Sequence, residues 1–96
     1  MADAQVLSFE VFGKVQGVFF RKHTQAKGVE LKLRGWCENT QSGTVRGEVC
    51  GEAEALEKFK HWLQHTGSPK SKITKAEFSV INKIPTSLPL PFAIKK

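Results

Sequence analysis

Long hydrophobic runs are absent from the sequence, and cysteine is rare. No uninterrupted apolar stretch approaches the ~18 residues of a membrane-spanning helix. The first residues also lack the basic start and apolar centre of a secretory signal. Cys37 and Cys50 are too few for a disulfide framework, and we expect them to be free thiols packed as small hydrophobic side chains. These absences predict a soluble cytoplasmic protein without a membrane partner.

Dense blocks of one charge are also absent, although positive charge predominates. The formal net charge of +6 favours anionic partners. Basic residues are scattered along the chain, whereas a nucleic-acid-binding tail would concentrate them. A chain of 96 residues forms one small domain, residues 1–96, with one hydrophobic core. We therefore expect a monomer that binds a small-molecule anion and no nucleic acid.

Hydrophobic periodicity predicts an alternation of strands and helices. Two helices are expected, at residues 20–31 and 52–66. Strands are expected at residues 6–12, 34–40, 44–51 and 73–81, with a short one at 92–94. The order β-α-β-β-α-β is that of the ferredoxin-like fold, an α+β sandwich. Both helices would then cover one face of an antiparallel sheet, and the final strand would lie at an edge because of the neighbouring prolines.

The most informative segment is residues 13–21, GKVQGVFFR, which joins the first strand to the first helix. Its two glycines allow a tight turn with backbone N–H groups pointing inward. A helix N-terminus adds partial positive charge, and Arg21 can contact two oxygens of a phosphate. The segment therefore indicates a phosphate-binding loop.

This segment and a second one, residues 35–47 (GWCENTQSGTVRG), resemble the acylphosphatase family, including its small common-type and muscle-type enzymes. The likeness continues through Gly-Ser-Pro at residues 67–69 and spans nearly the whole chain. It implies a ferredoxin-like fold and hydrolysis of small acyl phosphates without a cofactor or metal. It also implies that Arg21 and Asn39 are catalytic and that Thr40 supports them. The implied substrate-binding residues are Val15, Gln16, Gly17, Val18, Phe19, Phe20 and Arg21.

Each of these residues also has an ordinary structural interpretation. An arginine at a helix start is commonly a surface charge, although the helix dipole disfavours it there. Asn39 and Thr40 are typical of residues that enter a turn. His61 and His65 have the spacing of metal ligands, but no third ligand is evident, so we expect a solvent-facing pair.

Three features depart from the family pattern. Lys32 stands where a glycine is usual, so we expect either a left-handed backbone conformation at a cost of ~1 kcal/mol or a remodelled helix end. Glu38 stands where the family is often basic or neutral, and strand alternation is expected to direct it away from the face used by Asn39. Pro89 and Pro91 fall where the family has a tyrosine, which this chain lacks.

The alternative is a non-catalytic ferredoxin-like module that binds RNA or a small anion. An RNA-recognition domain places aromatic side chains on its central strands, and residues 44–51 contain none. A pure anion sensor needs the phosphate loop but not Asn39. Both observations favour the hydrolase.

Overall fold

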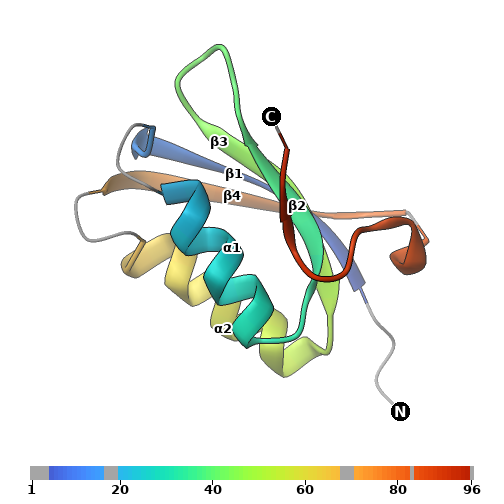
Figure 1. Ribbon diagram of the computed structural model, residues 1–96. Helices are drawn as coiled ribbons and strands as arrows, with labels where there is room; N and C mark the ends of the chain where they lie inside the picture. Colours follow the sequence, from blue (N-terminus) through green and yellow to red (C-terminus); the bar gives the residue numbers. More distant parts are fainter. Residues whose placement is uncertain (1–4, 17–19, 68–70, 83, 96) are drawn as a thin grey trace.

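The computed structural model describes residues 5–16, 20–67, 71–82 and 84–95. In this part of the chain, two helices cover one face of a five-stranded sheet (Figure 1). The helices are α1 (Phe20–Glu30) and α2 (Ala53–His65). The strands are β1 (Gln5–Lys14), β2 (Arg34–Asn39), β3 (Val45–Gly51), β4 (Lys72–Ile81) and β5 (Ala93–Ile94). A short 3-10 helix, η1 (Pro85–Ser87), precedes β5.

The strands lie in the order β4-β1-β3-β2-β5. The four long strands pair antiparallel, as the sequence predicts, whereas β5 pairs parallel with β2. The sheet is therefore mixed, with its short fifth strand at one edge. The chain reaches that edge through η1 and the segment after it, where the Gly35 N–H donates to the Pro89 carbonyl at 2.9 Å. It then continues alongside β2, and the Lys95 N–H donates to the Cys37 carbonyl at 2.8 Å.

Alternation along β1 positions the hydrophobic core. Leu7, Phe9 and Val11 are buried in the core cluster, which also contains Phe59 and Leu63 of α2. The Phe9 and Phe59 rings meet edge to face, with centroids 5.8 Å apart. Residues of the other parity face the side of the sheet that the helices leave open. Val6 is buried there in a second cluster with Cys50 and Leu88, whereas Ser8 and Glu10 are partly exposed.

Gly28 of α1 has a packing role that its weak helix propensity does not reveal. It is buried, and a Cβ atom there would lie 2.6 Å from the ring of Phe92. Phe92 is fully buried and also contacts Phe59, with ring centroids 5.6 Å apart. The glycine therefore lets the segment before β5 pack directly against α1.

The end of α1 confirms the expectation for Lys32. Its φ is 58°, in the left-handed region. The Leu33 N–H donates to the Gly28 carbonyl at 2.9 Å, and the Lys32 N–H donates to the Val29 carbonyl at 3.0 Å. This is the Schellman pattern, in which glycine is the usual left-handed residue. A lysine there carries backbone strain that a glycine would not.

Replacing Lys32 by glycine should therefore stabilise the protein. We expect the free energy of unfolding of Lys32→Gly to rise by about 1 kcal/mol, because the left-handed penalty is removed. Urea unfolding followed by circular dichroism measures this change. The control is Lys58→Gly, the same substitution at an exposed position within α2, which should cost about 1 kcal/mol. Destabilisation of the protein by Lys32→Gly would show that the strain has been misjudged.

Candidate active site

The chain segments that follow β1 and β2 lie at the same end of the sheet's strands. Both β1 and β2 pair antiparallel with β3, so they run in the same direction. Val45 of β3 lies opposite Val11 on one side and Asn39 on the other. The chain leaving β1 reaches the first turn of α1, where Arg21 lies. Strand pairing thus brings the region around Arg21 toward Asn39.

A hollow of about 380 Å³ lies at this end of the strands. Three of the predicted site residues line it together, namely Arg21, Asn39 and Thr40. Its remaining lining residues are Glu38, Gln41, Arg46 and Lys95. Arg21 and Asn39 come from different elements, so their convergence is a property of the fold. Sequence reasoning did not single out Arg46 or Lys95 as site residues.

The other predicted residues divide into three groups. Val15 and Phe20 are buried, and the Phe20 ring packs against Trp62 with centroids 5.7 Å apart. Gln16 is partly buried and contacts the turn after β2. Gly17, Val18 and Phe19 lie outside the described residues.

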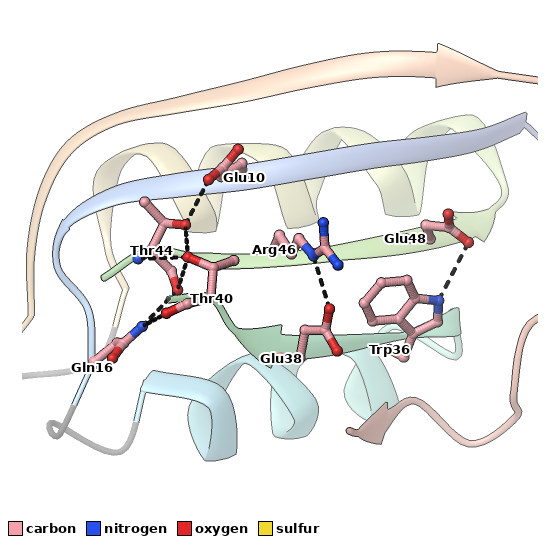
Figure 2. A network of polar contacts seen from close by, with 8 residues as sticks. All are labelled: Glu10, Gln16, Trp36, Glu38, Thr40, Thr44, Arg46 and Glu48. Carbon is pink, nitrogen blue, oxygen red and sulfur yellow. Dashed lines mark hydrogen bonds and ion pairs between the residues drawn. The ribbon is translucent and has the colours of Figure 1, made fainter. Parts of the chain in front are cut away.

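Gln16 joins the start of the loop to the β2–β3 turn (Figure 2). Its side-chain amide donates to the carbonyls of Thr40 and Thr44, each at 2.9 Å. One side chain thus bonds to both ends of the turn that follows Asn39. These contacts join segments more than twenty residues apart in sequence, so Gln16 fixes the end of the chain segment that follows β1 against the turn after Asn39.

A chain of hydrogen bonds supports the same turn from the sheet side (Figure 2). The Thr44 hydroxyl donates to Oε2 of Glu10 at 2.6 Å, and the hydroxyls of Thr40 and Thr44 are also 2.6 Å apart. The Thr44 N–H donates to the Thr40 hydroxyl at 3.1 Å. With the Thr44 proton directed at Glu10, the Thr40 hydroxyl donates to that of Thr44. Thr40 therefore supports the turn through Thr44.

Sequence analysis selected neither Glu10 nor Thr44 as a site residue. Thr44 is 5% exposed, so its hydroxyl is removed from water and needs protein partners. The contacts join β1 to the β2–β3 turn, and no short sequence motif contains both positions. The alternation of side chains along β1 places Glu10 on the open face of the sheet, but only the strand register brings it close to Thr44.

The electrostatics of the hollow favour an anion. The first turn of α1 has no acidic residue, so no carboxylate of that turn offsets the positive end of the helix dipole. Arg21, Arg46 and Lys95 bring positive charge, and Glu38 brings negative charge. Nε of Arg46 lies 2.8 Å from Oε2 of Glu38. Strand alternation places Glu38 beside Arg46 on the open face, as expected, but β2 ends at Asn39, so both Glu38 and Asn39 line the hollow.

Cys37 lies directly beneath this region. Its Sγ donates a weak hydrogen bond to the Arg21 carbonyl at 3.8 Å. Burial raises the pKa of the Cys37 thiol to about 12, Arg21 opposes the rise, and Glu38 adds to it. Burial also raises the pKa of Cys50, which Arg34 opposes. Neither cysteine forms a disulfide, and both are buried, as predicted.

The geometry can be compared with that of known proteins. The acylphosphatase family model matches residues 7–89. The chain belongs to the acylphosphatase family. It is 56% identical over 80 residues to acylphosphatase-1 of Xenopus tropicalis, a match that covers 81% of this chain and 82% of that protein. It is 51% identical over 82 residues to acylphosphatase-1 of Homo sapiens, a match that covers 82% of this chain and 83% of that protein.

A solved structure gives the same answer. The acylphosphatase from Bacillus subtilis superposes with a TM-score of 0.87 at 30% identity, covering 98% of this chain and all of that one. The predicted acylphosphatase enzyme and its ferredoxin-like fold are therefore confirmed.

Three further findings concern the described residues only. No three His, Cys, Asp or Glu side chains gather there as a group able to hold a metal ion. His61 and His65 are exposed as predicted, and their rings are tilted by 47° with centroids 4.6 Å apart. No helix in the same part of the chain is long and apolar enough to cross a membrane.

Removing the Thr44 hydroxyl should destabilise this acylphosphatase. In Thr44→Val the Glu10 carboxylate and the Thr40 hydroxyl both lose a partner, so we expect a loss of about 1–3 kcal/mol in the free energy of unfolding. Urea unfolding measures the loss. Thr74→Val is the matched control, an exposed threonine on β4, and should change stability by less than about 0.5 kcal/mol. Equal effects of both substitutions would argue against a supporting network.

The raised thiol pKa values predict chemical inertness. At pH 8 only about one Cys37 thiol in ten thousand is ionised, and the side chain is buried. Native protein treated with iodoacetamide should show no alkylation of Cys37 by mass spectrometry, whereas protein in urea should be alkylated at both cysteines. Rapid native labelling of Cys37 would contradict this description of the site.

Proposed function

We propose that the chain hydrolyses the carboxyl–phosphate bond of small acyl phosphates, with Arg21 binding the phosphoryl group and Asn39 orienting the attacking water. The observation that supports this assignment is the presence of both side chains in the lining of one hollow. Family membership supports the reaction. The division of roles between the two residues is our proposal.

Phosphoryl binding requires positive charge and N–H donors. In this proposal, backbone N–H groups of residues 15–20 and the positive end of α1 contact the phosphoryl oxygens. Arg21 adds a planar guanidinium that can donate to two oxygens at once. Its position in the first turn of a helix is unfavourable for a cation, and a bound phosphate offsets that cost.

Asn39 supplies both a donor and an acceptor to a water molecule. The water oxygen attacks phosphorus while the bond from phosphorus to the carboxylate oxygen breaks, and the bonding electron pair leaves with the carboxylate. The water proton passes to a phosphoryl oxygen of the substrate. Because a carboxylate departs without protonation, positioning and charge neutralisation supply the catalysis, and no general acid is needed.

Substitution of the two residues separates their roles. Purified protein is mixed with acetyl phosphate in the presence of a metal chelator, and release of inorganic phosphate is followed. We expect Arg21→Gln to lose both turnover and phosphate binding, and Asn39→Ala to lose turnover by at least about 100-fold while still binding phosphate. Phosphate binding is measured as a shift in the melting temperature.

The outcomes distinguish the alternatives clearly. A folded parent that binds phosphate but releases none from acetyl phosphate would overturn the hydrolase and favour the non-catalytic anion-binding module. An Asn39→Ala variant blind to phosphate would overturn the division of roles. Activity that disappears with the chelator would overturn the metal-independent, cofactor-free scheme.

A further inference from the structure

The hollow that contains Arg21 and Asn39 opens onto the helix-free face of the sheet. A second hollow, of about 660 Å³, lies over that face. Glu38, Arg46 and Lys95 line both hollows, so these three side chains form the boundary between them. A substrate held by its phosphate near Arg21 could therefore extend its acyl portion toward Arg46 and Lys95.

The charges at this boundary leave one positive charge in excess. Arg21 is assigned to the phosphoryl group, which leaves Arg46 and Lys95 opposed by Glu38. On the far side of the boundary, the larger hollow is lined by further carboxylates, those of Glu10, Glu48 and Glu77. Among the residues that line the two hollows, positive charge is thus confined to Arg21 and to the boundary residues Arg46 and Lys95. This arrangement suits an acyl group that carries one carboxylate close to its reacting carbonyl.

The two cations are held in place by their surroundings. Arg46 bonds to Glu38 through Nε, and its terminal nitrogens carry its other donors (Figure 2). The ammonium of Lys95 lies 4.0 Å from the centroid of the Trp36 ring, within cation–π range. Arg46 is paired with Glu38, the residue before Asn39, and paired strands lie ~5 Å apart. An arginine side chain easily covers the distance from there to a short acyl chain.

We propose that Arg46 and Lys95 bind a carboxylate on the acyl portion of the substrate, so that the site selects acyl phosphates of short dicarboxylic acids over those of uncharged acids. Glu38 limits this selectivity because it competes with the substrate carboxylate for Arg46. The inference rests on the hydrolase function proposed above and assigns the specificity to residues outside the phosphate-binding loop.

The test compares succinyl phosphate with acetyl phosphate. The quantity measured is the ratio of their kcat/KM values, at low and at physiological ionic strength. We expect Arg46→Gln and Lys95→Gln each to lower this ratio by about two- to five-fold, the size of a partly exposed charge interaction. Glu38→Gln should raise it by about two-fold, and added salt should reduce the ratio of the parent.

Two further variants separate local contact from general charge. Arg46→Lys keeps the charge and should retain most of the selectivity. Lys58→Gln removes the same charge from α2, outside both hollows, and should leave the ratio as in the parent. A ratio that is the same in the parent, Arg46→Gln and Lys95→Gln overturns the inference, as does an equal fall in Lys58→Gln.

A binding measurement distinguishes failure of this inference from failure of the hydrolase proposal. Acetonylphosphonate and 4-oxo-5-phosphonopentanoate are non-hydrolysable analogues that differ by the added carboxylate-bearing chain. Calorimetry should show tighter binding of the second by the parent, with the preference reduced about two- to five-fold in Arg46→Gln. Arg46-dependent preference without any acetyl phosphate hydrolysis would support the carboxylate site and sink the hydrolase. Hydrolysis with no such preference would do the reverse.

Discussion

The central strand β3 sets the geometry on which the rest of the site depends. Val45 lies between Val11 and Asn39, and both neighbouring strands run antiparallel to β3. The chain segments that follow β1 and β2 are therefore brought to the same end of the strands. A slip of one residue in the β2–β3 register would reverse the side of the sheet that each β2 side chain faces. Asn39 and the first turn of α1 can cooperate only because this pairing is maintained by a buried core on one face.

Much of the fold could be predicted from local signals. The two helices and the strands lie within a few residues of the predicted bounds, because the period of hydrophobic residues differs between helix and strand. The left-handed conformation of Lys32 was predicted from the family resemblance, because a glycine is usual at that position, and it is confirmed. The direction of β5 was not predicted as parallel, since strand pairing is a long-range property. Two residues of strand cannot reveal which neighbour they join.

The site was predicted unevenly for the same physical reason. Arg21 and Asn39 belong to contiguous motifs and could be found by resemblance. Glu10 and Thr44 act through a hydrogen bond between positions 34 residues apart, so no local pattern records their contact. Lys95 reaches the hollow because the segment before it packs against α1 at Gly28 and then pairs parallel with β2. The departures at Pro89 and Pro91 therefore fall in a segment that shapes one wall of the site, whereas the strain at Lys32 lies at the opposite end of α1 from Arg21.

The distribution of charge explains how a basic protein can direct an anion to one place. The excess of positive charge is general, but the open face of the sheet carries the carboxylates of Glu10, Glu48 and Glu77. Among the residues that line the two hollows, positive charge comes only from Arg21, Arg46 and Lys95. Arg21 stands in the first turn of a helix, where the dipole disfavours a cation, and no acid of that turn relieves the cost. Because a helix N-terminus and a guanidinium both attract anions, the proposed binding of an anion here would stabilise the folded state.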